Sequence, residues 1–259
     1  MTRLTLYLDR SLEENAGAYY EKAKKLKKKI EGARKAWEET RKKIALLEKE
    51  AEKEKKREEQ KKPEREKKWF EKFRWFISSE GFLVVGGRDA TSNEIIVKKH
   101  AEKNDLVFHT DITGSPFFVV KAENKKIGDK TKQEAADATV TYSKAWKMNL
   151  QTTSVFFAMP EQLTKTAKPG EYVPRGGFVT TGKLNYIGNR VNLAVGITKE
   201  EEIMAGPVDA IRSNCEKFVE IGQGREKTSQ TAKRIQKKIG GELDEIVRAL
   251  PAGGCEIKK

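Results

Sequence analysis

The sequence has few of the residues that build metal centres, disulfide frameworks and membrane spans. It holds two cysteines and two histidines, and Cys215 and Cys255 match no metal-ligand spacing. No apolar run approaches the roughly 20 residues that cross a bilayer. The opening residues MTRLTLYLDR lack the apolar core of a secretory signal. We therefore expect a cytoplasmic protein in a reduced setting, with no cofactor, no metal and no membrane partner.

Charge, by contrast, is abundant and unevenly distributed. Lys and Arg total 53 against 39 Asp and Glu, a net charge of +14. Residues 1–68 hold 23 basic and 15 acidic residues, a net of +8, and most aromatic residues come later. Excess Lys and Arg displace counterions from phosphate backbones, which favours nucleic acid as a partner. The shift in composition predicts a charged helical arm over 1–68 and a compact domain over 69–259.

The arm is predicted to be one long helix from residue 12 to about residue 60. Between Leu12 and Ala51 apolar or small residues recur at alternating spacings of four and three, which is a heptad seam. Ser11 precedes Glu14 by three residues and can cap the first turn. Because an isolated amphipathic helix buries little surface, the seam predicts a coiled-coil partner along residues 12–51, in the same chain or another.

The compact domain is predicted to be α+β, with a mostly antiparallel sheet and packed helices, because strands and helices alternate and short turns join several strands. The predicted strands lie at 82–85, 105–111, 117–122 and 154–159, with a hairpin of 176–183 and 190–197 about a turn at 185–189. The predicted helices lie at 92–101, capped by Ser92 or Asn93, and at 131–148. From about residue 199 we expect a helical C-terminal extension, with a helix at 208–215, a short strand at 218–221 and two short helices before Pro251.

A segment rich in glycine and basic residues, 164–186, is the first candidate site. Glycines let a backbone approach a phosphate closely, and flanking Lys and Arg supply charge. Exposed tyrosines can stack on an unpaired base. A glycine-rich hairpin with solvated lysines would give the same pattern. The candidate RNA contacts here are Lys165, Lys168, Tyr172, Arg175, Lys183, Asn185 and Tyr186.

Two polar pairs at strand ends are further candidates. Arg88 and Asp89 follow a Gly-Gly turn, where the guanidinium could contact a phosphate or form an ion pair that caps the turn. His109 and Asp111 stand two apart on a predicted strand and therefore face the same side. This pair could orient an imidazole toward a phosphate or a 2′-hydroxyl.

The same pair could also belong to a hydrolytic or metal site. A metal would need a third ligand, and the other histidine, His100, falls on a predicted helix. The nearest candidate nucleophile is Ser143, which lacks the G-x-S-x-G elbow of serine hydrolases. We therefore predict no catalytic residue and no metal ligand, and keep a small phosphate-handling enzyme built on His109, Asp111 and Ser143 as an alternative.

Four blocks, taken in order, resemble a known family: WFEKFRWFISSEGFLVVGGRDATSNEIIVKKH, DLVFHTDITGSP, YSKAW and KTAKPGEYVPRGGFVTTGKLNY. They are similar to the RNA-binding domain of the NFACT family, and DRSLEENAGAYYEKAKKLKKKIEGA resembles the start of that family's coiled-coil arm. The blocks add Lys98, Lys144 and Trp146 to the candidate RNA contacts, although an aromatic residue at a helix end more often packs in a core.

The resemblance implies a function in ribosome-associated quality control. Members of the family bind the large ribosomal subunit that carries a stalled peptidyl-tRNA, recruit tRNA and promote untemplated C-terminal tailing. Nothing here matches the family's N-terminal domain, its helix-hairpin-helix segment or its C-terminal module. We therefore expect binding to large-subunit rRNA and tRNA rather than tailing. The main alternative is a protein-interaction adaptor in which the heptad seam is the working surface.

Overall fold

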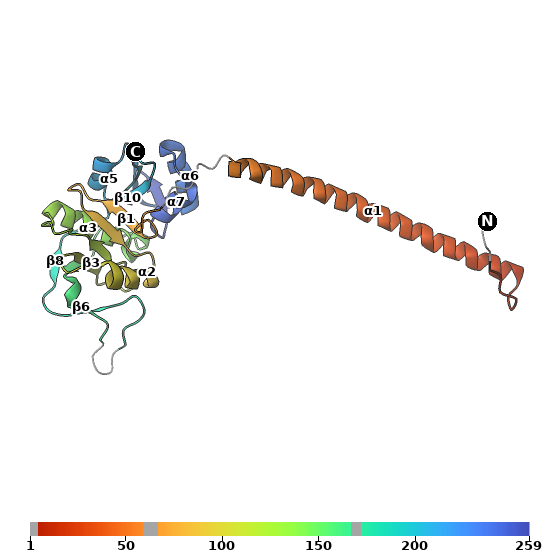
Figure 1. The fold of residues 1–259 in the computed structure, drawn as a ribbon, viewed down its shortest axis with the longest axis horizontal. Coiled ribbons are helices and arrows are strands. Elements are labelled where there is room, and N and C mark those ends of the chain that lie inside the picture. Colours follow the sequence, from red (N-terminus) through yellow and green to blue (C-terminus); the bar gives the residue numbers. More distant parts are fainter. Residues whose placement is uncertain (1–4, 60–66, 167–171, 259) are drawn as a thin grey trace. The chain divides into compact units, whose positions relative to one another are not determined.

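The structure is a computed structural model that describes residues 5–59, 67–166 and 172–258. The chain divides into two compact units, Met1–Glu66 and Lys67–Lys259. The first unit is dominated by a single helix, α1 (Leu12–Glu59), drawn in red to orange in Figure 1. The long helix predicted from the heptad pattern is therefore confirmed.

The first turn of α1 is capped as the sequence indicates. The amide of Glu14 donates to Ser11 Oγ at 3.1 Å, and the amide of Ser11 donates to Glu14 Oε2 at 2.8 Å. The chain before the cap folds back over the helix, because the Tyr19 hydroxyl donates to the carbonyl of Thr5 at 2.8 Å. Beyond these turns the apolar side chains of the seam are exposed, including Trp37 at 61%.

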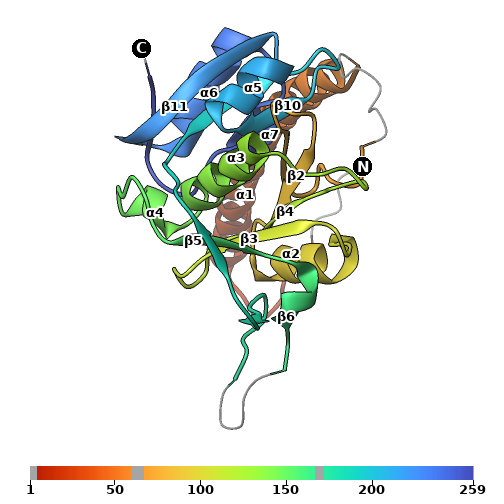
Figure 2. The same cartoon turned by 90° about the vertical axis from the view of Figure 1, so that its left-hand side faces the viewer.

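The second unit contains two antiparallel sheets and a short two-stranded ribbon (Figure 2). The six strands of the larger sheet, in spatial order, are β1 (Arg74–Ile77), β2 (Leu83–Gly86), β4 (Phe118–Val120), β3 (Leu106–Thr110), β5 (Val155–Ala158) and β8 (Asn185–Ile187). The four strands of the second sheet are β10 (Ile203–Gly206), β9 (Leu193–Ile197), β11 (Lys217–Glu226) and β12 (Cys255–Ile257). The ribbon pairs β6 (Leu163–Thr164) with β7 (Val179–Thr180). These pairings confirm the predicted α+β class.

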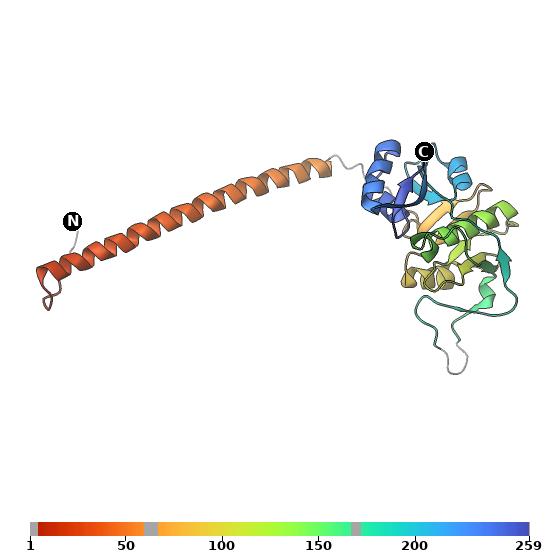
Figure 3. The same cartoon turned by 180° about the vertical axis from the view of Figure 1, so that it is seen from behind.

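Helices cover both sheets. They are α2 (Ala90–Ile95), continued by a π-helical turn (Ile96–His100), α3 (Asp129–Thr141), α4 (Lys144–Lys147), a 3-10 turn (Pro160–Gln162), α5 (Val208–Asn214), α6 (Thr228–Ile239) and α7 (Leu243–Ala249). The alanine-rich face of α3 packs on the larger sheet, where Ala135 and Ala138 are buried in one cluster with Phe108. The blue helices α6 and α7 contact the second sheet (Figure 3).

The two sheets share one hydrophobic interior. Met204 of β10 and Ile211 of α5 lie in the same buried cluster as Phe76 of β1. A Cβ on Gly206 would fall 2.7 Å from the ring of Phe76, so glycine lets β10 approach β1. The segment after residue 199, predicted as a helical extension, thus contributes strands to the second sheet as well as helices.

Two helix predictions differ from the structure. The helix predicted over 131–148 is two helices, because Ser143 adopts an extended backbone and its side chain caps α4 by accepting from the amide of Ala145 at 3.1 Å. Neither Ser92 nor Asn93 caps α2. Asp89 is the N-cap, and its carboxylate accepts from the amide of Ser92 at 2.7 Å.

The hairpin predicted about residues 185–189 is wrong. Residues 185–187 form strand β8 and pair with β5, with Phe156 opposite Tyr186. The preceding segment forms β7 and pairs with β6, while β9 enters the second sheet. Pairing with a buried strand therefore overrides the turn chemistry of Asn and Gly. Strands β1, β6, β10 and β12 were not predicted.

Candidate nucleic-acid interface

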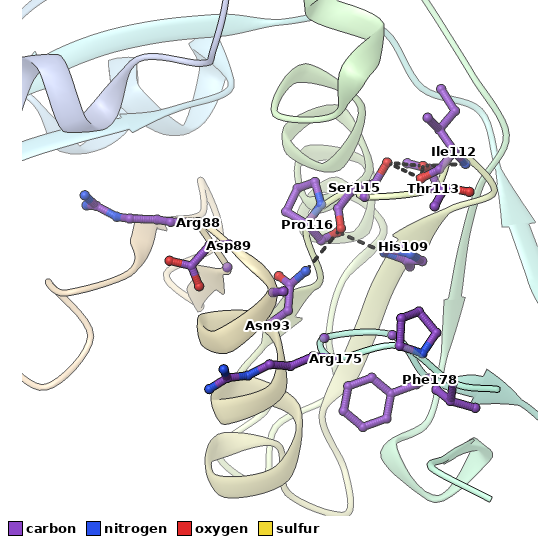
Figure 4. A pocket seen from close by; sticks show the side chains of 18 of the residues that line it. Arg88, Asp89, Asn93, His109, Ile112, Thr113, Ser115, Pro116, Arg175 and Phe178 are labelled. Carbon is purple, nitrogen blue, oxygen red and sulfur yellow. Dashed lines mark hydrogen bonds between the residues drawn. The ribbon is translucent and has the colours of Figure 1, made fainter. Parts of the chain in front are cut away.

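A cavity of about 550 Å³ opens at one edge of the larger sheet. It is lined by the turn 87–90, the loop 109–116 and the segment 172–179, together with Arg74, Asn93 and Tyr142 (Figure 4). We call this cavity the cleft. The pairing of strands explains why its walls meet: β2 and β3 each run antiparallel to β4, so their carboxyl ends lie at the same edge. The turn that carries Arg88 and Asp89 therefore lies at the same end of the sheet as His109 and Asp111, although the Arg88 side chain extends away from His109 (Figure 4).

Arg88 and Asp89 have different partners. Asp89 is occupied by capping α2, and the described residues contain no salt bridge between it and Arg88. Arg88 Nη2 donates to the carbonyl of Phe73 at 2.8 Å, whereas its Nε is buried without a hydrogen-bond partner. Burial lowers the pKa of Arg88, and the neighbouring charge of Arg74 lowers it further. The ion pair predicted as the alternative for this turn is therefore not formed.

Arg74 and Tyr142 also line the cleft, and neither was predicted from the sequence. The guanidinium of Arg74 lies 4.2 Å from the centre of the Tyr142 ring, and its Nη1 donates to the carbonyl of Leu250 at 3.4 Å. Burial lowers the pKa of Arg74 and raises the pKa of Tyr142 to about 12. The Tyr142 hydroxyl donates to Ala249 at 2.8 Å. The sequence does contain a signal for Arg74, which stands between Phe73 and Trp75. An arginine flanked by buried aromatic residues is rarely buried itself unless it has a polar partner.

His109 is held in one orientation. Its ring stacks on Phe117 with centroids 3.8 Å apart and an interplanar angle of 3°, and Nδ1 lies 3.0 Å from the carbonyl oxygen of Pro116. A carbonyl only accepts, so Nδ1 carries the proton and Nε2 is an acceptor. Burial lowers the pKa of His109, while the nearby charge of the exposed Asp111 raises it less. The neutral imidazole is thus suited to accept from a ribose hydroxyl and not to donate to a phosphate.

The segment 172–179 is docked on α2 through Glu94. Lys165 Nζ lies 3.3 Å from Glu94 Oε2, and the amide of Gly176 donates to the same oxygen at 3.3 Å. Lys98 contacts the other oxygen at 2.7 Å. These contacts, with Lys98 first, lower the pKa of Glu94 to about 2. Lys165 also lies 4.6 Å from the ring of Phe178. Lys165, which also donates to the carbonyl of Pro174 at 3.4 Å, therefore holds the loop in place, whereas Lys98 pairs with Glu94 within the same helical segment.

The other predicted contacts separate into distinct groups. Arg175 and Tyr172 line the cleft and are exposed, Tyr172 at 85%. Lys144 is exposed near the loop 109–116, since its Cε would lie 3.5 Å from a Cβ at Gly114. Outside the cleft, three exposed residues follow one another on or beside β8: Lys183, Asn185 and Tyr186. Lys168 lies outside the described residues.

Trp146 does not fit a surface contact. It is 2% exposed within the second hydrophobic cluster, and its indole Nε1 donates to the carbonyl of Gly254 at 2.9 Å. Trp146 therefore occupies a core position, which was expected from the sequence as the more common place for such a residue. The prediction of Trp146 as an RNA contact is therefore contradicted by its burial.

Ser143, the nucleophile considered for catalysis, already has other partners. The hydroxyl of Ser143 is buried and donates to the carbonyl of Val140 at 2.7 Å, in addition to capping α4. Within the described ranges, no three His, Cys, Asp or Glu side chains are grouped to hold a metal ion. No helix in the described part of the chain is long and apolar enough to cross a membrane.

Comparison with known families agrees with this geometry. Residues 72–182 match the family described as the NFACT protein RNA binding domain. Arg74, Arg88, His109 and Arg175 all fall inside the matched residues, so most of the cleft belongs to that domain. The chain is an NFACT family protein, and the resemblance read from its four sequence blocks is confirmed.

Relatives with curated names extend the match beyond this domain. The archaeal Rqc2 homolog aRqcH of Methanocaldococcus jannaschii is 40% identical over 186 residues, 69% of this chain and 28% of the relative. Ribosome quality control complex subunit NEMF of Homo sapiens is 38% identical over 178 residues, 67% of this chain and 16% of the relative. The alignments thus span less than a third of either relative. The C-terminal of the fibronectin/fibrinogen-binding protein from Streptococcus suis aligns with 70% of this chain and 77% of its own at 20% identity and a TM-score of 0.38, a likeness that carries no further argument.

Proposed function

We propose that this chain is the RNA-contacting part of a ribosome-associated quality control factor, acting on cytoplasmic ribosomes. The cleft and the exposed basic residues beside it bind RNA of the large ribosomal subunit and tRNA. The names of the relatives support the quality control setting, and the family description supports RNA as the ligand. On this proposal the chain supplies binding and positioning, with no reaction of its own.

One observation carries the proposal: three guanidinium groups line the cleft, and among the described residues none of them forms a salt bridge. These groups belong to Arg74, Arg88 and Arg175. Arginines that serve only the fold are usually paired, because desolvating an isolated charge is costly. Unpaired guanidinium groups at a cavity are suited to phosphate, which they bind in a bidentate manner.

The test measures the affinity of the chain for a large-subunit rRNA fragment and for tRNA across a range of salt concentrations. Contacts to phosphates release counterions, so the affinity should fall steeply with salt. The double variant Arg175→Gln/Lys183→Gln should weaken binding on the order of tenfold and reduce the salt slope by about two. Lys165 stays unchanged, because its ion pair with Glu94 holds the loop.

The matched control removes the same charge elsewhere. Lys125 and Lys126 are exposed in the loop after β4, at the opposite end of that strand from the cleft. Lys125→Gln/Lys126→Gln should therefore leave RNA affinity nearly unchanged. Equal losses in both double variants would show that only net charge matters, and salt-insensitive binding would contradict the proposal.

The ribosomal partner has a separate test in cells. Ultraviolet crosslinking of the chain, followed by sequencing of the attached RNA, should recover large-subunit rRNA together with tRNA. Recovery of mRNA alone, or of no RNA, would overturn the quality control assignment.

The exposed seam of α1 favours a second candidate function, that of a protein-interaction adaptor. Apolar side chains recur along the helix and remain exposed, among them Leu26, Ile30 and Ile44. Exposed apolar stripes of this length are typical of coiled-coil pairing. Such pairing would add a protein partner to the RNA-binding domain and does not compete with it.

A further inference from the structure

Two guanidinium groups, Arg74 and Arg88, line the cleft; the carboxylate of Asp89 acts on Arg88 through its charge but caps α2 and forms no salt bridge with it. Arg88 stands in the turn after β2, and Arg74 begins β1, which pairs with β2 through Arg74 opposite Gly86. The charge of Arg74 lowers the pKa of Arg88, and the exposed Arg248 of α7 acts on Arg88 in the same direction. In the part of the chain that the structure describes, none of the three has a carboxylate partner within salt-bridge distance.

The side chain of Arg88 has an unused donor. Its Nη2 is fixed by the carbonyl of Phe73, and its Nε–H is buried with no acceptor within reach among the described residues. Buried donors are nearly always paired, so an orphan of this kind calls for a ligand. A phosphate oxygen would accept from Nε and at the same time offset the repulsion between Arg74 and Arg88.

The volume of the cleft limits which class of ligand can place a phosphate beside these arginines. A volume of about 550 Å³ lies in the range of small-molecule sites and accommodates one nucleotide. A double helix is too wide to enter such a cavity, and the phosphates of paired strands cannot reach partly buried guanidinium groups. An unpaired nucleotide can leave its stack and enter, as RNA-binding modules commonly require.

The rest of the lining offers groups for a base and a ribose. Tyr172 is exposed at the cleft and provides an aromatic face for stacking. His109, which lies on the other side of the cleft from the Arg88 side chain (Figure 4), leaves Nε2 as an acceptor for a donor group of the nucleotide, because Nδ1 is engaged by Pro116. The exposed carboxylate of Asp111 can accept from an exocyclic amino group or a ribose hydroxyl.

We propose that the cleft takes a single unpaired nucleotide of RNA, with its phosphate held between Arg74 and Arg88. This inference rests on the proposed RNA-binding function and adds to it the form of the RNA: a strand end, a bulge or a loop nucleotide, and not a continuous duplex. The exposed basic residues near the cleft then contact the phosphates of the neighbouring nucleotides. The cleft itself binds only RNA in which one nucleotide is unpaired and can enter.

The first experiment titrates the full chain with adenosine 5′-monophosphate, adenosine and inorganic phosphate. The readout is the NMR signal of the Arg88 Nε–H, which should shift when a phosphate oxygen accepts from it. We expect the monophosphate to bind at least tenfold more tightly than either adenosine or inorganic phosphate. Equal binding of inorganic phosphate would reduce the site to a plain anion site and overturn the nucleotide inference, and an unmoved Nε–H signal would overturn it as well.

Variants distinguish a loss of the binding site from a loss of folding. Arg88→Gln removes the bond to Phe73 and can disturb β1, so Arg74→Gln and the charge-keeping Arg88→Lys are made beside it. Arg74→Gln should weaken the monophosphate at least tenfold while the circular dichroism spectrum and melting temperature stay near those of the wild type. Arg225→Gln, on the exposed surface of β11, removes the same charge away from the cleft and should change nothing. Loss of binding in Arg225→Gln to the same degree would contradict the assignment.

A second pair of ligands keeps this inference separate from the general function. A blunt RNA duplex is compared with the same duplex carrying a single-stranded 3′ overhang, and the overhang should strengthen binding to the wild type but not to Arg74→Gln. If both proteins bind both RNAs equally, the cleft inference fails while RNA binding stands. If the wild type binds the monophosphate and neither RNA, the proposed function fails and the nucleotide site remains.

Discussion

Gly176 is the residue at which the loop over the cleft meets α2. Its φ is +77°, and a Cβ there would lie 2.5 Å from the Cα and the carbonyl oxygen of Ala90. Both the positive φ and the close backbone approach require glycine. The position of Arg175 at the cleft therefore depends on a residue that carries no side chain.

Gly176→Ala should move the loop off α2. We expect a loss of on the order of 1–3 kcal/mol in the free energy of unfolding and roughly tenfold weaker RNA binding, because the strained backbone and the contact with Ala90 act together. Gly188→Ala is the control, since a Cβ on Gly188 would meet no described atom within 4 Å and its φ lies outside the left-handed region. Denaturant titration and RNA binding measure both effects, and equal behaviour of the two variants would refute the role of the close approach.

His109 provides a prediction about pH. Because burial lowers its folded pKa below the ordinary value of about 6.5, the unfolded chain binds the proton more readily. The resulting stability is present above about pH 6.5 and is lost as the pH falls below it. The free energy of unfolding should therefore drop between pH 7.5 and pH 5.5, and drop less in His109→Gln. The pKa of the half-buried His100 is lowered in the same direction, so a residual slope is expected. An unchanged slope in His109→Gln would contradict the prediction.

At the scale of elements, the break between α3 and α4 turns the chain at the cleft. Tyr142 stands at this break and packs under Arg74, and Ser143 begins the next helix. The break follows from hydrogen bonding: the Ser143 hydroxyl bonds the carbonyl of Val140 and caps α4, which competes with continuing the helix. A local capping motif therefore sets where the chain turns, while the Tyr142 ring is held by its own hydrogen bond to Ala249 and its contact with Arg74.

Ser143→Ala should lower the free energy of unfolding by about 1–2 kcal/mol, because it removes a buried cap. Monophosphate and RNA binding should remain within about twofold of the wild type, since Ser143 supplies no contact to the ligand. Ser213→Ala, which removes an exposed hydroxyl bonded to Asp209 within α5, is the matched control and should cost less than half as much. A variant of normal stability that had lost a phosphate-releasing activity would instead favour the enzyme alternative.

Patterns within one element were readable from the sequence, and patterns that depend on pairing were not. The strands β2, β3, β4 and β5 follow from runs of β-branched and aromatic residues, and α1 follows from its heptads. The partner of β8 could not be read, because Asn185–Ile187 carries turn-forming neighbours and is selected as a strand only by β5. For the same reason Arg88 and His109 were found as strand-end residues, whereas Arg74 entered the candidate site only when β1 was seen to pair with β2.

At the scale of the whole molecule, the two units differ in how much of their apolar surface is buried. The domain has its own buried clusters, whereas α1 exposes large apolar side chains such as Trp37 and Leu47. A helix of this kind is stabilised chiefly by packing against another. A coiled-coil partner remains a prediction, and the chain itself is the simplest one to test.

Sedimentation equilibrium of the full chain should show association at micromolar concentrations if α1 pairs with a second copy. The variant Trp37→Glu/Ile44→Glu places charge on the seam and should shift the chain toward a monomer without altering RNA binding by the domain. Lys35→Glu/Lys42→Glu introduces the same acidic residues off the seam as a control. A monomer for all three proteins would direct the search to a different protein partner.

The interior shared by the two sheets sets the boundaries for expressing this domain. The family match ends at residue 182, but Ala194, Met204 and Ile211 fill the cluster around Phe76, and Ala249 and Leu250 bond Tyr142 and Arg74. A clone that stopped at residue 182 would expose that cluster and release both cleft residues. The smallest soluble and ligand-competent piece should therefore run from Lys67 to the C-terminal strand β12, and truncation at the family boundary should yield inclusion bodies.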